Sequence, residues 1–122
     1  SPFRWSVYIE DDKRFYQVYV DALKNKLTYN YFEKKHVSEG LNHRTEGDNI
    51  IEKIENLEIV KTYLWFARFP VVSINKEDDG YLVEYFDLRF NSIPPRRPFI
   101  LQLFVDKNGI LNHSELMFHT IK

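Results

Sequence analysis

Hydrophobic and polar residues alternate along the first quarter of the chain. In the segment FRWSVYIE, residues 3–10, every second side chain is apolar: Phe3, Trp5, Val7 and Ile9. This two-residue period is that of a half-buried β-strand. A polar turn, Asp11 to Lys13, separates it from RFYQVYVDAL, and LTYNYF at residues 27–32 continues the pattern. The sequence therefore predicts a hairpin followed by a third strand.

The period changes in the middle of the chain. Residues 34–47 are polar and contain glycine, which predicts a loop. Between residues 49 and 67, apolar side chains recur at steps of three and four: Ile50, Ile54, Leu57, Val60 and Leu64. This spacing is typical of an amphipathic helix, and Asn49 with Glu52 suits a capping box. We predict one long helix, or a helix broken near Asn56, with an apolar stripe that a sheet must cover.

Four further strand-like segments follow the helix, at residues 69–75, 81–90, 99–105 and 110–118. Polar turns ending in Gly80 and Gly109 mark two hairpins among them. The predicted order is β-β-β-α-β-β-β-β, an α+β fold in which a curved antiparallel sheet of about seven strands packs on the helix. No break in composition divides the sequence, so we expect a single soluble domain over residues 1–122.

Composition excludes several classes of function. The chain has 17 Lys and Arg against 18 Asp and Glu, a net charge of -1, so it lacks the basic footprint of a nucleic-acid-binding protein. It has no cysteine, which excludes disulfides and thiolate nucleophiles. No segment approaches the ~20 apolar residues of a membrane-spanning helix. We expect no nucleic-acid partner.

No motif predicts catalysis by this chain. The sequence contains no G-x-S-x-G motif, P-loop or dinucleotide-binding fingerprint. Its histidines are His36, His43, His113 and His119, and their spacings of seven and six do not match a helical zinc motif. His113 and Glu115 share one face of the last strand, as is usual on the polar side of an edge strand. We therefore predict no catalytic residue, metal ligand or cofactor in this chain.

The strongest candidate site lies in YFDLRF, residues 85–90. Period-two alternation predicts that Phe86, Leu88 and Phe90 face the helix, with Tyr85, Asp87 and Arg89 on the opposite face. A carboxylate and a guanidinium two residues apart either pair with each other or bracket a ligand. The tentative ligand-binding set adds two arginines and comprises Tyr85, Asp87, Arg89, Arg68 and Arg97. The competing hypothesis is a buried polar bridge that fixes the junction between helix and strand.

Four segments carry a resemblance to a known family. They are SPFRW at residues 1–5, WFARFP at 65–70, DGYLVEYFDLRF at 79–90 and RPFILQLFVDKNG at 97–109. Together they resemble the C-terminal region of the YdjM/YfhP-like inner-membrane proteins, described as metal-dependent hydrolases and in part regulated by LexA. The residues that match motif positions of that region are Trp5, Arg68, Phe69, Pro70, Asp87, Arg89 and Phe90.

The resemblance implies a larger protein with membrane-spanning helices before this chain. The full-length protein would then lie in the cell membrane, and a divalent metal would belong to the part that precedes this chain. The family's histidine motif has the form H-R-x-x-x-H-S, whereas here His43 and Arg44 are followed by neither the second histidine nor the serine. Two hypotheses of function stay open. The chain is an accessory domain that binds a protein partner or small ligand, or it contributes regulation or catalysis to a hydrolase whose metal site lies elsewhere.

Overall fold

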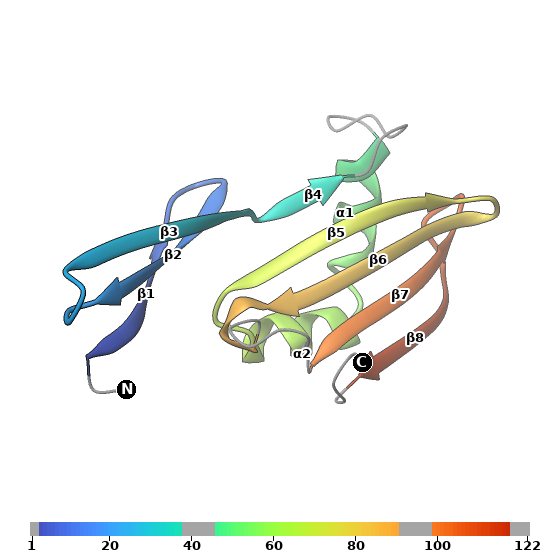
Figure 1. The fold of residues 1–122 in the computed structure, drawn as a ribbon. Coiled ribbons are helices and arrows are strands. Elements are labelled where there is room, and N and C mark those ends of the chain that lie inside the picture. The colour runs from blue at the N-terminus through green and yellow to red at the C-terminus, as the bar shows by residue number, and fades with distance from the viewer. Residues whose placement is uncertain (1–2, 38–45, 91–98, 118–122) are drawn as a thin grey trace. The chain divides into compact units, whose positions relative to one another are not determined.

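A computed structural model of the chain describes residues 3–37, 46–90 and 99–117. Two compact units divide it, Ser1–Lys34 and Lys35–Lys122. Each unit has a sheet of its own, with strand order β1-β2-β3 in the first and β4-β5-β6-β7-β8 in the second (Figure 1). The α+β class is confirmed. The single sheet of about seven strands is corrected to two sheets, because alternation gives the face of each strand but not the strand with which it pairs.

The first unit is an antiparallel meander of three strands: β1 (Arg4–Glu10), β2 (Arg14–Asp21) and β3 (Lys26–Glu33). The carboxylate of Asp11 fixes the first turn by accepting the backbone N–H groups of Lys13 at 2.9 Å and Arg14 at 2.8 Å. Such a side-chain bond is the reason that aspartate is favoured in turns. The predicted hairpin and third strand are thus confirmed.

The described residues of the second unit form five strands, two α-helices and a short 3-10 helix. Its elements are β4 (Lys35–Val37), α1 (Asp48–Ile54), α2 (Glu58–Phe66), β5 (Pro70–Glu77), β6 (Gly80–Asp87), η2 (Leu88–Phe90), β7 (Ile100–Asp106) and β8 (Leu111–Met117). All neighbouring strands are antiparallel except β4 and β5, which are parallel. β4 was not predicted, because it lies in the polar segment interpreted as a loop.

The predicted helix is broken where the sequence allowed it. Glu55, Asn56 and Leu57 separate α1 from α2. The capping box is wrong: α1 begins after Gly47 with no side-chain cap hydrogen bond. The N-cap is Gly47, two residues before the predicted Asn49, so Asn49 lies inside the first turn of the helix.

The core of the second unit lies between the two helices and one face of the sheet. The helices contribute Ile50, Ile51, Ile54, Val60 and Tyr63, and the strands contribute Val72, Ile74, Tyr81, Val83, Tyr85, Leu101, Leu103 and Val105. The strand residues form cross-strand rows, for example Ile74 beside Val83 and Val83 beside Leu103. Because every one of these side chains is less than a tenth exposed, the helices cover the inner face of this sheet.

Two glycines are required by local geometry. Gly109 has φ of 84° in the turn between β7 and β8, a conformation that L side chains rarely adopt. Gly80 opens β6 opposite Asp106, and a Cβ atom there would lie 2.0 Å from the carbonyl oxygen of Val105. Both positions were predicted as the ends of hairpin turns. Among the helices of the described residues, none is long and apolar enough to cross a membrane.

Candidate functional site

Strand β6 presents the opposite face to the one predicted. Its buried residues are Tyr81, Val83, Tyr85 and Asp87, whereas Leu82, Glu84 and Phe86 are half-buried. Tyr85 and Asp87 therefore point to the helix side of the sheet. The prediction used Phe86, Leu88 and Phe90 as one strand face, but the strand ends at Asp87 and the chain turns into η2. A 3-10 turn does not continue the two-residue period.

Asp87 is the centre of a polar cluster between α2 and the start of β5. Its carboxylate accepts the backbone N–H groups of Arg68 at 3.0 Å, Phe69 at 3.3 Å and Arg89 at 3.0 Å. The Nε of Arg89 donates to it at 2.9 Å. We call Asp87, the Arg89 side chain and the backbone of Arg68 and Phe69 the Asp87 junction. It corresponds to the buried polar bridge expected between helix and strand, except that Arg68 contributes its backbone N–H instead of its guanidinium.

The charge of Asp87 is held by these donors. Burial raises the pKa of Asp87, but the backbone N–H and side chain of Arg89, with the N–H groups of Arg68 and Phe69, outweigh it, so the pKa lies below its usual value. The Asp87 side chain is fully buried, whereas the Arg89 side chain is 33% exposed. Both carboxylate oxygens of Asp87 thus accept hydrogen bonds from the chain itself, as a buried structural bridge requires.

The two tyrosines beside the junction are also interior residues. The hydroxyl of Tyr63 donates to the carbonyl of Phe99 at 2.6 Å, and the rings of Tyr63 and Tyr85 have centroids 6.0 Å apart. Burial raises the pKa of both. Within the described residues the Tyr85 hydroxyl is buried without a hydrogen-bond partner. Arg97, the fifth residue of the predicted set, lies outside the described residues.

A groove on the same unit was not predicted. It has a volume of about 340 Å³, and α2, β7, β8 and the residue before β7 line it with Ile59, Thr62, Tyr63, Trp65, Phe66, Phe99, Leu101 and Leu116. We call it the α2 groove. Trp65 is 87% exposed, the highest value among the large apolar residues of the described chain. The lining is almost wholly apolar.

The sequence did carry a signal for this groove. Ile59, Tyr63 and Phe66 follow one another at steps of four and three, the same spacing that identified the core stripe. This second stripe lies beside the first on α2, and Phe99 and Leu116 complete it from distant parts of the sequence. Helical spacing alone does not distinguish a stripe that packs on the sheet from one that stays at the surface.

Arg89 connects the Asp87 junction with the α2 groove. Its guanidinium donates to the carbonyl of Phe66 at 3.2 Å and lies 5.2 Å from the centroid of the Phe66 ring. The Phe66 ring in turn lies 5.6 Å from that of Phe99. The junction therefore holds the C-terminal turn of α2, which carries the aromatic side chains of the groove.

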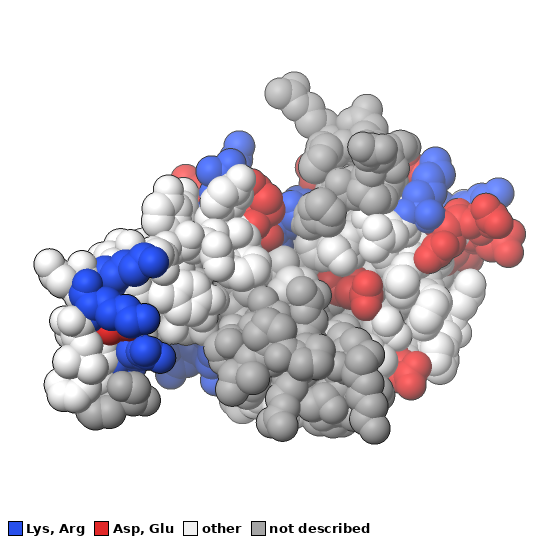
Figure 2. Space-filling view, in the orientation of Figure 1, with Lys and Arg blue, Asp and Glu red and all other residues white. Residues whose placement is uncertain are grey.

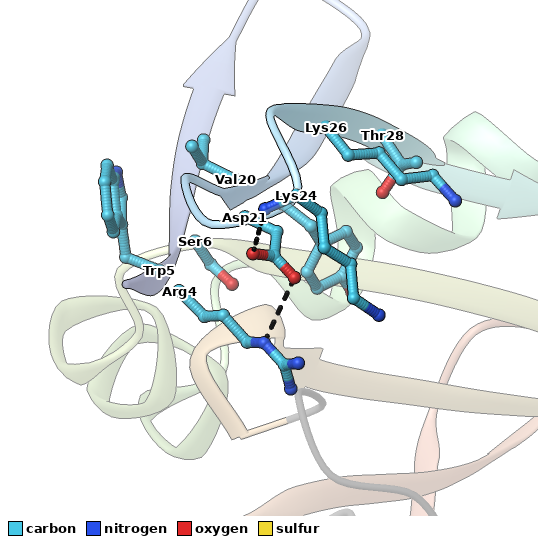
Figure 3. A pocket seen from close by; sticks show the side chains of 9 residues that line it. Arg4, Trp5, Ser6, Val20, Asp21, Lys24, Lys26 and Thr28 are labelled. Carbon is cyan, nitrogen blue, oxygen red and sulfur yellow. Dashed lines mark hydrogen bonds and ion pairs between the residues drawn. The ribbon is translucent and has the colours of Figure 1, made fainter. Parts of the chain in front are cut away.

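The first unit has a hollow of about 460 Å³, whose lining combines the charged residues Arg4, Asp21, Lys24 and Lys26 with Trp5, Tyr19 and Val20 (Figure 3). Nε of Arg4 and Oδ2 of Asp21 are 3.2 Å apart; the Arg4 side chain is 63% exposed and that of Asp21 is 20% exposed. Lys and Arg side chains are prominent over this unit in Figure 2.

Metal-binding residues do not converge in the described part of the chain, where no three His, Cys, Asp or Glu side chains are grouped to hold an ion. His36 lies in β4 and His113 in β8, where its ring faces that of Phe104 at 5.6 Å. His43 and His119 lie outside the described residues. The geometry of the second unit thus offers an apolar groove and a structural ion pair.

Comparison with known families identifies the second unit. The family model of the YfhP C-terminal alpha/beta plait domain matches residues 49–119, from the start of α1 to beyond β8. No curated protein and no solved structure matches the chain. The match covers more than half of the 122 residues and contains the Asp87 junction and the α2 groove. The chain belongs to the YfhP C-terminal alpha/beta plait domain family.

Proposed function

We propose that the chain is a non-catalytic accessory domain of a membrane-bound metal-dependent hydrolase, and that it binds an apolar protein segment in the α2 groove. The hydrolase and membrane context rests on the family resemblance of the sequence. The observation that supports binding is the exposure of Trp65, 87%, beside an apolar groove. Exposed tryptophan next to a preformed apolar pocket is typical of the residues that dominate protein interfaces.

The chemistry of the groove favours a protein segment over a metabolite. Small-molecule sites usually combine an apolar wall with a few polar groups that orient the ligand. Here the polar lining is limited to the Thr62 side chain and the Tyr63 hydroxyl, and that hydroxyl already donates to the Phe99 carbonyl. A bulky aliphatic or aromatic side chain needs no such orienting group. We therefore propose a peptide segment with one apolar anchor as the occupant.

Arg89 is the one predicted ligand residue that we retain at this site. Its guanidinium is partly exposed and stacks near Phe66, which lines the groove. A partner backbone carbonyl or carboxylate at the border of the groove is a suitable acceptor for it. Tyr85 and Asp87 act indirectly in this proposal, since they support the helix and strand that form the groove.

Selection of peptides from a random phage-displayed library tests the proposal. We expect the selected peptides to share a Leu, Phe or Trp anchor and to lose at least about ten-fold in affinity for Trp65→Ala. Ile110→Ala is the matched control, because it removes an exposed apolar side chain of the second unit that does not line the groove. Peptides that bind Trp65→Ala as tightly as the parent chain would contradict the proposal. So would Trp65-dependent binding to phosphatidylcholine vesicles in place of peptides.

A further inference from the structure

The two faces of the first unit's sheet differ sharply in chemistry. The register aligns Trp5 with Val20 and Leu27, then Val7 with Val18 and Tyr29, and then Ile9 with Tyr16 and Tyr31. Because side chains alternate between faces, these three rows share one face. All nine residues are apolar or aromatic. The opposite face is mixed: it carries Arg4, Ser6 and Thr28, and it also carries Phe15 and Gln17, which are 2% and 1% exposed. We call the nine-residue face the aromatic face.

The aromatic face is exposed. Six of its members are 42–65% exposed: Trp5, Val7, Ile9, Leu27, Tyr29 and Tyr31. Tyr16, Val18 and Val20 on the central strand are half-buried, and the Tyr16 ring lies 6.4 Å from the rings of both Tyr29 and Tyr31. A contiguous apolar surface of this size on a soluble protein usually marks an interaction site.

We propose that the aromatic face packs against the same face of a second copy of the chain, so that two three-stranded sheets form a sandwich across a two-fold axis. A flat face of aromatic and β-branched side chains is complementary to itself, as a two-fold interface requires. Sheets that pack face to face interdigitate such side chains across a layer of about 10 Å. This inference is independent of the α2 groove, which lies on the second unit.

The exposed area matches the size of a stable interface. With roughly 150–250 Å² for each aromatic side chain and less for the aliphatic ones, the exposed parts of the nine residues sum to on the order of 700 Å². A standard protein interface takes about 800 Å² from each partner. The aromatic face alone therefore supplies nearly all the area that a specific dimer needs.

Charge does not oppose this pairing. The aromatic face ends at Arg14 and Glu33, which already form an ion pair, with 2.9 Å between Nε and Oε1. The Arg14 guanidinium also lies 4.6 Å from the centroid of the Tyr31 ring. No unpaired charge of this pair has to be buried when two faces meet, and the net charge of -1 gives little repulsion between copies.

Sedimentation equilibrium of the whole chain tests the proposal. The expected result is a reversible dimer of twice 14.8 kDa. Tyr29→Glu should raise the dimer dissociation constant at least about ten-fold, because it places a charge in the apolar interface. Thr28→Glu is the matched control: Thr28 is the adjacent residue of β3, is also exposed but lies on the other face, and its substitution should leave the constant unchanged. Circular dichroism verifies that both variants fold.

Disulfide cross-linking gives a second measurement that does not depend on loss of stability. The chain has no cysteine, so each variant carries a single thiol. Tyr29→Cys should form a covalent dimer under mild oxidation much faster than Thr28→Cys. A chain that stays monomeric at about 100 μM, far above the affinity expected for this area, would overturn the proposal. Two other results would also overturn the proposal. One is a dimer that Trp65→Ala abolishes and Tyr29→Glu does not; the other is a monomer that binds phosphatidylcholine vesicles through the aromatic face.

Discussion

The apolar faces of the two sheets differ in how they are covered. Both are built mainly from antiparallel strands with one strongly apolar face. In the second unit that face is covered by α1 and α2, and Leu103, Ile74 and Val83 are completely buried. In the first unit the equivalent face carries Leu27 and Tyr29, which are 65% and 61% exposed. The described residues of the first unit contain no helix that could cover this face, and a small three-stranded sheet gains little stability alone.

The family match follows the division of the chain into two units. It begins at residue 49 and so lies wholly within the second unit, which has its own core. The first unit precedes it and has the aromatic face as its main exposed apolar surface. According to the two proposals above, the second unit binds a partner in the α2 groove and the first unit brings copies of the chain together. The predictions below test that contrast in order of expected effect.

The largest effect is expected from the same substitution placed in each sheet. Leu103→Ala removes a fully buried side chain from β7 and should lower the free energy of unfolding by about 2–5 kcal/mol. Leu27→Ala in β3, measured at low protein concentration, should change it by less than about 0.5 kcal/mol. Urea unfolding followed by circular dichroism measures both. Equal losses would show that the aromatic face is as well covered as the core.

Loss of the Asp87 carboxylate should have the next largest effect. Asp87→Ala leaves the backbone N–H groups of Arg68 and Phe69 without their acceptor and should cost about 3 kcal/mol. Arg89→Ala should cost only about 1 kcal/mol, since its side chain is a third exposed and charge at the surface is well solvated. The double substitution should then cost clearly less than the sum. Additivity within about 0.5 kcal/mol would contradict a shared network.

The same carboxylate predicts a pH dependence. Because the pKa of Asp87 is lower in the folded chain than its ordinary value of 3.8, the unfolded state binds a proton first as the pH falls. Its contribution to stability is therefore complete at neutral pH and is lost as the pH falls from about 4 through the folded pKa. The difference in unfolding free energy between the parent chain and Asp87→Asn should shrink over this interval. A difference that is constant from pH 7 to pH 2 would argue against an ionised Asp87.

The smallest effect on stability is expected at the two tryptophans. Trp65→Ala should change the free energy of unfolding by no more than about 0.5 kcal/mol, because most of its side chain is in solvent. Trp5→Ala should behave in the same way in dilute solution and lose stability relative to the parent only where the dimer forms. Thermal unfolding of both variants at two protein concentrations distinguishes these outcomes. If Trp65→Ala, and not Trp5→Ala, removed the dependence of the unfolding temperature on protein concentration, the α2 groove and not the aromatic face would form the dimer.

Much of this architecture follows from the sequence. Period-two segments predicted seven of the eight strands found in the described residues, and the three- and four-residue spacing predicted α1 and α2 with their break near Asn56. Local patterns succeed there because turns and helices depend on neighbouring residues. The face of β6 was missed because η2 ends the alternation after Asp87, and because the donors that make a buried carboxylate tolerable come from residues 68 and 69. The α2 groove was missed because Phe99 and Leu116 join Phe66 only in the folded chain.

Hydrogen exchange of the whole chain at two protein concentrations tests the central contrast most directly. Amides of β2, which pairs with strands on both sides, should exchange more slowly in the concentrated sample, because a second copy covers the aromatic face. Amides of β6, which lies in the sheet covered by α1 and α2, should exchange at the same rate in both samples. Protection of β2 that does not change with concentration would contradict the account.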